Sequence, residues 1–169
     1  MRSKSIIEKI LLLIFLTILA VGIIFIVKQN NNLPLKQPTD FNFIFKYGVG
    51  AKNELNTFNQ TFTKDMIIDP SITTKFNLTE KELSDVYRKI VDLGIFKKDW
   101  KFLEKNMSIT PCSSYYLKIQ INSEQRELSF DNCHGELSGK LQKFKDYIIK
   151  IIEAKEEYKK LPTPTGGYD

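Results

Sequence analysis

Two cysteines and the only histidine of the chain lie close together in its second half. Cys112 opens the stretch CSSYYLKIQINSEQRELSFDNC, Cys133 ends it, and His134 follows directly. Thiolate and imidazole groups bind zinc, and a cysteine beside a histidine can act as an activated nucleophile. Three kinds of site therefore compete for these residues: a metal centre, a Cys–His nucleophile and a disulfide.

The strand pattern between the cysteines favours the disulfide. Apolar and polar residues alternate on both sides of Ser123-Glu124, which is typical of a β-hairpin. A turn there would pair Ile119 with Leu128 and keep the apolar residues of both strands on one face. Cys133 would then lie opposite Ser114, close to Cys112. Two cysteines at the open end of one hairpin predict a disulfide in an oxidising compartment.

The metal and nucleophile alternatives are weaker. A structural zinc site needs four ligands and a catalytic one needs three plus water. Adjacent residues of an extended chain point to opposite sides, so Cys133 and His134 converge poorly. No CxxC or HxxxH spacing occurs. His134 precedes Gly135 and is interpreted as a surface turn residue, so the sequence predicts no metal site and no catalytic cysteine.

Other patterns that carry chemistry are absent or incomplete. Gly48-Val49-Gly50 lacks the third glycine of a dinucleotide loop and the Lys-Ser or Lys-Thr pair of a phosphate loop, so we interpret it as a hairpin turn. No spacing pairs two carboxylates for acid–base catalysis. The net charge of +5 is mild and does not indicate a nucleic-acid partner. The sequence therefore predicts no cofactor and favours a protein that is not an enzyme.

The N-terminal segment predicts attachment to a membrane. Residues 10–27 contain no charged side chain and would form a helix about 27 Å long, close to the thickness of a bilayer core. Basic residues outweigh Glu8 in residues 1–9, which favours a cytoplasmic N-terminus and an extracytoplasmic domain behind a single-pass anchor. The alternative is a cleaved signal peptide, with Ala20-Val21-Gly22 as the nearest cleavage site.

The rest of the chain reads as a linker over 28–40, an α+β domain over 41–161 and an extended tail over 162–169. Aromatic residues alternate from Phe41 to Tyr47, and residues 57–68 read as the returning strand of a hairpin. A capping box and a periodic apolar stripe predict a helix over 80–93. A second stripe of apolar residues, which begins at Leu137, predicts an amphipathic helix of about twenty residues. The expected order ββαββα indicates a small antiparallel sheet with two helices packed on one face.

Several motifs resemble a family of uncharacterised bacterial proteins that are exported or tethered to the membrane. The resemblance is carried in order by FIFKYGVGAKNELNTF, TKDMIIDPSI, PCSSYYLKI, DNC and EYKKLPTPTGGYD, and it covers residues 43–168. No activity is assigned to that family. The resemblance therefore implies an extracytoplasmic location and a cysteine pair, and it implies no reaction.

Taken together, the sequence predicts a membrane-anchored extracytoplasmic domain that binds another envelope protein or a peptide. An exposed sheet edge can accept a further strand. A second candidate surface is the tail, with Leu161, Pro162, Gly166, Gly167 and Tyr168 as its characteristic residues; alternatively the tail packs back on its own domain. Two other functions stay open: an envelope enzyme whose site is assembled only by folding, from residues such as Asp131, His134, Tyr115 or Lys64, and a stress-sensing ectodomain that acts through partners.

Overall fold

The computed structural model describes residues 9, 11–19, 21–22, 34, 36–96, 103–104, 111–132, 135–136 and 139–168. The chain divides into two compact units, Met1–Leu35 and Lys36–Asp169. Cys133, His134 and Leu137 lie outside the described residues, so the predictions made for them are not addressed by the fold.

The expectation of a membrane-spanning helix over residues 10–27 is wrong. The helical residues described there are 11–19 and 21–22, and residues 11–19 extend only about 14 Å at about 1.5 Å per residue. Crossing a bilayer core of about 30 Å needs roughly 20 residues. Among the helices that the structure describes, none is long and apolar enough to span a membrane.

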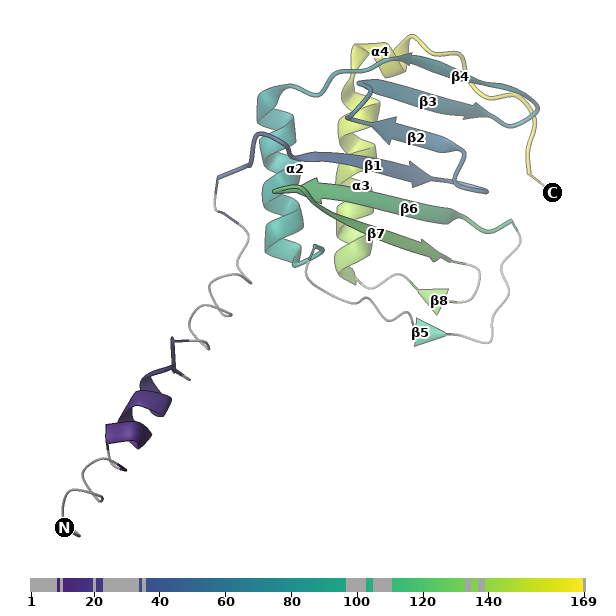
Figure 1. Ribbon diagram of the computed structural model, residues 1–169. Coiled ribbons are helices and arrows are strands. Elements are labelled where there is room, and N and C mark those ends of the chain that lie inside the picture. Colours follow the sequence, from purple (N-terminus) through teal and green to yellow (C-terminus); the bar gives the residue numbers. More distant parts are fainter. Residues whose placement is uncertain are drawn as a thin grey trace, which may run out of the picture. The chain divides into compact units, whose positions relative to one another are not determined.

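The second unit is an α+β domain built on a six-stranded antiparallel sheet (Figure 1). The strand order is β4-β3-β2-β1-β6-β7. The strands are β1 (Asn42–Tyr47), β2 (Asn53–Asn56), β3 (Thr61–Met66), β4 (Asp69–Lys75), β6 (Ser114–Ile121) and β7 (Glu124–Asp131). A separate two-stranded ladder pairs β5 (Leu103–Glu104) with β8 (Gly135–Glu136). The chain thus forms a meander of four strands and then adds the β6–β7 hairpin beside β1.

The predicted order ββαββα is wrong, because four strands precede the first helix of this domain. Residues 57–68 are not one returning strand: β2 returns from β1, and β3 and β4 follow as a second hairpin. β2 is only four residues long, and β4 contains Pro70 and three Thr or Ser side chains rather than an apolar alternation. Neither segment carries the period-two pattern on which the prediction relied.

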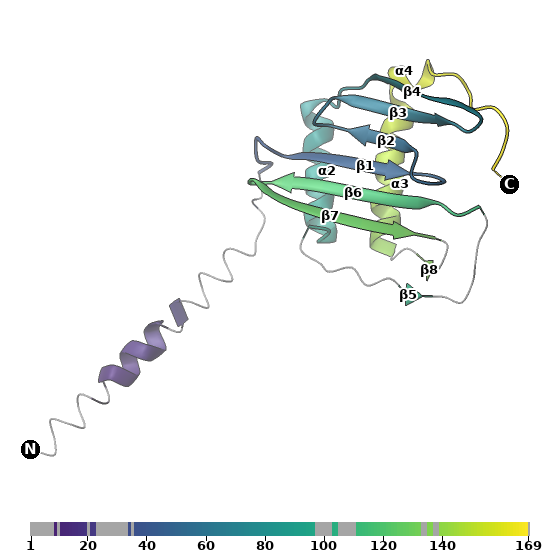
Figure 2. The same cartoon turned by 45° about the vertical axis from the view of Figure 1, so that its right-hand side comes forward.

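Two helices cover the same face of the sheet, as both ribbon views show (Figures 1 and 2). The ring of Phe41, just before β1, lies 5.2 Å from that of Tyr87 in helix α2 (Glu80–Leu93). Phe45 of β1 meets Phe144 of helix α3 (Gly139–Ala154) at 6.1 Å. Phe43 and Phe45 are fully buried, and these aromatic contacts form the centre of the core.

The local signals of helix α2 are confirmed. The hydroxyl of Thr79 accepts a hydrogen bond from the backbone N–H of Glu82, and the carboxylate of Glu82 accepts one from the N–H of Thr79. This reciprocal capping box satisfies two N–H groups that a helix start leaves unpaired. Gly94 ends the helix with φ of 67°, in the left-handed region that glycine adopts at little cost.

Helix α3 buries one stripe at spacings of three and four residues, as the sequence predicts. The buried residues are Leu141, Phe144, Ile148 and Ile152. A short helix, α4 (Glu156–Lys159), follows a break at Lys155, and the chain then leaves the helical layer as the C-terminal tail. We use the word tail for residues 161–168.

The β6–β7 hairpin forms, but its register differs by two residues from the prediction. Leu117 pairs with Leu128 and Tyr115 with Phe130, so Ser114 lies opposite Asp131 rather than position 133. The turn is at Asn122-Ser123, and both residues have positive φ, as in type I′ turns. A slip of two residues keeps every side chain on its predicted face, so hydrophobic alternation alone could not choose between the two registers.

Candidate functional site

The C-terminal tail lies against the turn that joins β3 to β4. Ile67 in that turn forms a parallel bridge with Thr165. The hydroxyl of Thr165 donates to Oδ2 of Asp69 at 2.7 Å. Figure 1 shows the tail, in yellow, leaving α4 and passing the β3–β4 turn. The tail residues named in the sequence analysis therefore lie on the domain surface, over strands far away in the sequence.

Beneath the tail is a cleft of about 480 Å³. Its walls come from the end of β1 and its turn, from β2, from β3, from the end of α3 with α4, and from the tail itself. The polar side chains that line it include Tyr47, Asn53, Lys64, Asp65, Tyr158 and Tyr168. A smaller pocket, of about 90 Å³, lies between the end of β4 and the start of α2.

Lys64 is a charged residue at a core position. Phe62, Lys64 and Met66 alternate along β3, and all three side chains point to the helix-covered face. The Lys64 ammonium group is 4.7 Å from the centre of the Tyr158 ring and donates to the carbonyl oxygen of Pro162 at 2.9 Å. With only 8% of its surface exposed, Lys64 needs such partners, because burying an unpaired charge is costly.

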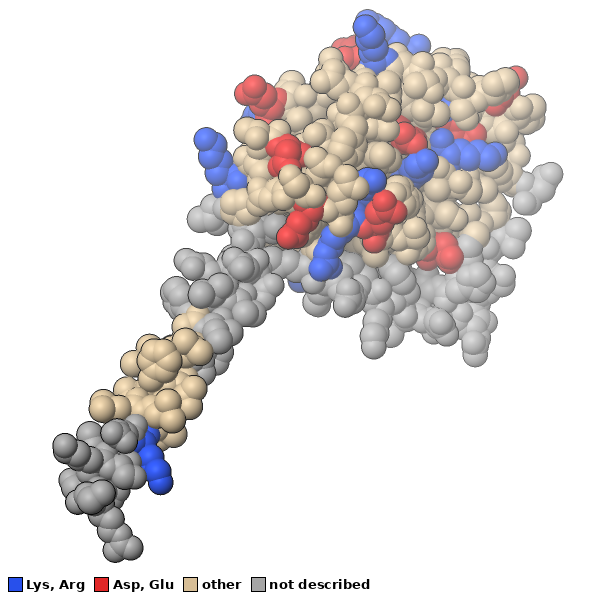
Figure 3. Space-filling view, in the orientation of Figure 1, with Lys and Arg blue, Asp and Glu red and all other residues tan. Residues whose placement is uncertain are grey.

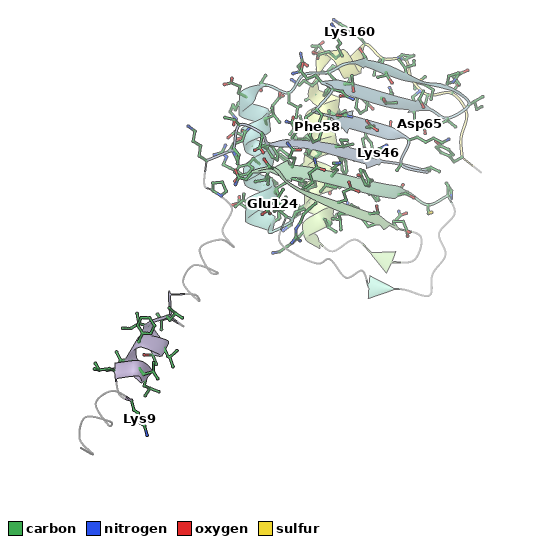
Figure 4. The ribbon with its side chains drawn as sticks, in the orientation of Figure 1. Lys9, Lys46, Phe58, Asp65, Glu124 and Lys160 are labelled. Carbon is green, nitrogen blue, oxygen red and sulfur yellow. The ribbon has the colours of Figure 1, made fainter. Side chains whose placement is uncertain are left out.

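Asp65 follows directly and is equally buried, with 7% exposed. A register shift between Lys64 and Met66 marks an irregularity in the β3–β4 ladder beside Asp65, with the extra residue on β4. Oδ1 of Asp65 accepts from the backbone N–H of Ile67 at 3.0 Å, and Oδ2 accepts from the hydroxyl of Tyr168. Figure 4 labels Asp65 beside the end of the tail. One carboxylate oxygen of Asp65 thus binds the turn, and the other binds the tail.

The phenols of the cleft are kept protonated. Burial raises the pKa of Tyr47 well above its ordinary value, and electrostatic repulsion from an ionised Tyr158 and from the Glu153 carboxylate adds to this. Burial also raises the pKa of Tyr158. Burial, followed by the hydrogen bond to Asp65, raises the pKa of Tyr168 to about 12. Phenols with raised pKa values donate hydrogen bonds and do not act as nucleophiles near neutral pH. The cleft is therefore suited to binding.

The structure does not bring together the residues named for an enzyme. Lys64 lines the cleft. Tyr115 is buried in the core and stacks on Phe130, with ring centres 4.9 Å apart. Asp131 pairs with Ser114 at the end of β7, which is not a neighbour of β3 in the sheet. Within the described residues, no group of three or more His, Cys, Asp or Glu side chains could hold a metal ion.

Gly48-Val49-Gly50 forms part of the β1–β2 hairpin turn, as interpreted from the sequence. Gly48 and Gly50 have φ of 93° and 63°, which favours glycine at both positions. The carbonyl of Gly48 accepts from the N–H groups of Ala51 and Ser114, each at 2.9 Å. The turn therefore connects the hairpin to the start of β6 and forms one wall of the cleft.

The two edges of the sheet are poor candidates for adding a strand. The edge strands are β4 and β7. β7 exposes Glu124, Arg126 and Glu127, and β4 contains Pro70, which lacks a backbone donor. Charged residues and proline on edge strands oppose strand addition. Basic and acidic side chains are interspersed on the face seen in Figure 3, which gathers no large area of one charge. The cleft under the tail is thus the better candidate.

Sequence reasoning missed Asp65, Tyr47, Asn53 and Tyr158 as members of one site. One signal was present: a lysine at the centre of the strand TFTKDM occupies a position where alternation predicts an apolar residue. Its partners are not predictable from local pattern, since Lys64 and Pro162 are 98 residues apart in the sequence. No protein-family model matches the chain, and no curated protein matches it significantly.

Proposed function

We propose that residues 36–168 form a non-enzymatic interaction domain that binds an extended segment of another protein in the cell envelope. One observation supports this above the others. The cleft at the β3–β4 turn already holds an extended polypeptide, the tail. Lys64 donates to a backbone carbonyl of the tail, and Asp65 and Asp69 accept from side-chain hydroxyls of the tail. These are the contacts by which proteins recognise extended peptides.

A location outside the cytoplasm, at the cell membrane, belongs to the same proposal. It is supported by the apolar run of residues 10–27 behind a basic N-terminus, a pattern that export signals also carry, and by the presence of two cysteines. Cys112, the one cysteine that the structure describes, is not a free thiol. Its pairing with Cys133 stays a prediction, because Cys133 lies outside the described residues.

Site-specific photo-crosslinking in intact cells tests the interaction. A photoreactive residue at Val49, which lines the cleft, should yield crosslinks to an envelope protein. The matched control is Thr73, on strand β4 and on the sheet face that the two helices leave uncovered. Equal crosslinking from both positions, or none from Val49, would contradict binding at the cleft.

Protease treatment of intact cells tests the location. External protease should remove epitopes placed in residues 36–168 while a cytoplasmic marker stays intact. Protection of the domain until the cells are lysed would contradict the extracytoplasmic location. Binding at the cleft would then be decided by the crosslinking result alone.

A further inference from the structure

The tail is attached to the cleft by polar contacts at its surface. No residue from 161 to 168 is buried, and Pro162, Thr163, Thr165, Gly166 and Gly167 are exposed. Its three side-chain contacts are hydrogen bonds to charged groups, which contribute about 1.5–3 kcal/mol each, since water competes for the same groups. Two of the receiving groups, Lys64 and Asp65, are 8% and 7% exposed with the tail in place, whereas the third, Asp69, is exposed. The cleft thus offers two buried charged groups to a segment that itself stays at the surface.

The receptor also stores backbone strain at the point of contact. Ile67 has φ of 68°, a conformation that β-branched residues rarely adopt. Its N–H is held by Asp65, and it forms the bridge to Thr165. Strained residues persist where the surroundings hold them in place, and they often mark binding sites. Here the strained residue is the one that meets the tail.

The contacts define the chemistry that the cleft accepts. Lys64 binds the backbone carbonyl of Pro162. Three residues further along the tail, Asp69 binds the hydroxyl of Thr165. Another three residues on, Asp65 binds the phenol of Tyr168. Between them, Gly166 has φ of 81°, which strains a residue with a side chain, and a Cβ atom there would meet the side chain of Ile68. The tail carries no charge from Leu161 to Tyr168.

From these contacts we infer that the tail is a competing internal ligand, and that the cleft binds in trans an extended, uncharged segment of a partner protein. That segment has a Ser or Thr followed by glycine, with tyrosine two residues after the glycine. The inference rests on the proposed function and adds the chemistry of the partner segment. Binding in trans then requires the tail to leave the cleft, which sets the affinity of the domain for its partner.

The test uses the full chain and a labelled synthetic peptide of sequence LPTPTGGY, which copies residues 161–168. Wild-type protein is compared with the double variant Thr165→Val/Tyr168→Phe, whose tail lacks both hydroxyl donors while the receiving residues Lys64, Asp65 and Asp69 are unchanged. We expect the peptide to bind the double variant more tightly by at least about tenfold, because the internal competitor has lost two hydrogen bonds to carboxylates. A peptide carrying Gly166→Ala should bind the double variant about tenfold more weakly, because alanine must adopt a positive φ there.

Asp65→Asn, made in the double variant, is the cleft control. It keeps an oxygen for the N–H of Ile67 but removes the charge that accepts the phenol, and we expect a loss of peptide affinity of about tenfold. A second readout needs no variant: peptide at saturation should displace the wild-type tail and speed cleavage by trypsin after Lys160, which is exposed at the base of the tail (Figure 4).

The following outcomes would overturn the inference or the proposed function. Equal peptide binding to all proteins, or no binding to a folded double variant together with no change in cleavage, overturns the inference. If the double variant exchanges its tail between two copies and forms dimers that Asp65→Asn abolishes, the occupant is a second copy and the partner segment is rejected. Crosslinks from Val49 without peptide binding would overturn this inference alone; peptide binding without such crosslinks would overturn the proposed function.

Discussion

The ammonium group of Lys155, at the junction of α3 and α4, lies 2.7 Å from Oε2 of Glu82 in the first turn of α2. The same oxygen accepts from the backbone N–H and the hydroxyl of Thr79. The capping box of one helix is thereby joined to the end of another. Burial alone would raise the pKa of Glu82, but the hydrogen bonds from Lys155 and Thr79 outweigh it and lower the pKa below its ordinary value of 4.5.

Replacing Glu82 by Gln should therefore destabilise the domain by about 1–2 kcal/mol at pH 7, measured by urea unfolding. Because the pKa is lower in the folded state, the carboxylate stabilises the fold above about pH 4.5, and this contribution is lost as the pH falls through the folded-state pKa. The difference between wild type and Glu82→Gln should shrink toward pH 3. Glu80→Gln, in the same turn but exposed, is the control. An equal loss of stability in Glu80→Gln would mean that the helix dipole, and not the contacts of Glu82, explains the effect.

The turn of the β6–β7 hairpin should accept a stabilising substitution. Ser123 has φ of 65°, which costs a side-chain-bearing residue more than glycine, and Asn-Gly is the preferred pair in type I′ turns. Ser123→Gly should raise stability by about 0.5–1 kcal/mol. Ser129→Gly, within strand β7, should lower it. A destabilising Ser123→Gly would mean that the serine side chain makes a contact worth more than the strain.

The two faces of β1 should differ in their tolerance to truncation. Phe45 is fully buried against Phe144, whereas Ile44 lies on the face that the helices do not cover. Phe45→Ala should cost about 3–5 kcal/mol, and Ile44→Ala less than about 1.5 kcal/mol. Thermal or urea unfolding of both variants measures this. Similar losses at both positions would show that something covers the second face.

The phenol of Tyr168 should titrate late. Burial and the hydrogen bond to Asp65 raise its pKa to about 12 from the ordinary value of 10. A raised folded-state pKa stabilises the protonated form, so this contribution is present below pH 10 and is lost as the pH rises through about 12. Absorbance titration should show one phenol near pH 12 that disappears in Tyr168→Phe and shifts down in Asp65→Asn. A titration near pH 10 would place the tail away from Asp65.

The corrected hairpin register sharpens the prediction for the cysteines. Beyond Ser114 and Asp131, the N–H of Asn132 donates to the carbonyl of Ser113 at 3.0 Å, and the N–H of Ser113 donates to Oδ1 of Asn132 at 2.7 Å. The same register continued by one residue predicts Cys112 directly opposite Cys133. Replacing both by Ser should cost about 3 kcal/mol on the chain-entropy model. Two thiols that alkylate fully in folded, unreduced protein would reject the pairing.

Local chemistry made some elements predictable from the sequence. Helix α2 begins and ends where Thr79, Glu82 and Gly94 indicate, because each of these residues acts on its own neighbours. The aromatic alternation of β1 also identifies its buried face. The prediction of the β6–β7 register failed for a physical reason. Apolar residues recur every two positions, so the choice rests on turn residues that tolerate positive φ, and the turn was expected at Ser123-Glu124 rather than at Asn122-Ser123.

Long-range contacts made the rest unpredictable. Tyr168 and Asp65 are 103 residues apart in the sequence, and no periodic pattern connects them. Edge strand β4 carries no apolar alternation, because its first three residues are all exposed and Thr74, not an apolar residue, occupies a half-buried position. The linker residue Asp40 accepts from the N–H groups of Asn122 and Ser123 at 3.1 and 2.6 Å, another contact that only the fold creates.

The central position of β1 has a consequence for how the domain forms. β1 pairs on one side with β2, its neighbour in the sequence, and on the other with β6, which arrives only after β4, α2 and the segment behind it. The meander β1–β4 and the hairpin β6–β7 each need only short loop closures, whereas the β1–β6 seam needs a long one. Joining the two halves is then the slow kinetic step. Amide hydrogens along that seam should gain their protection together, later than those inside either half.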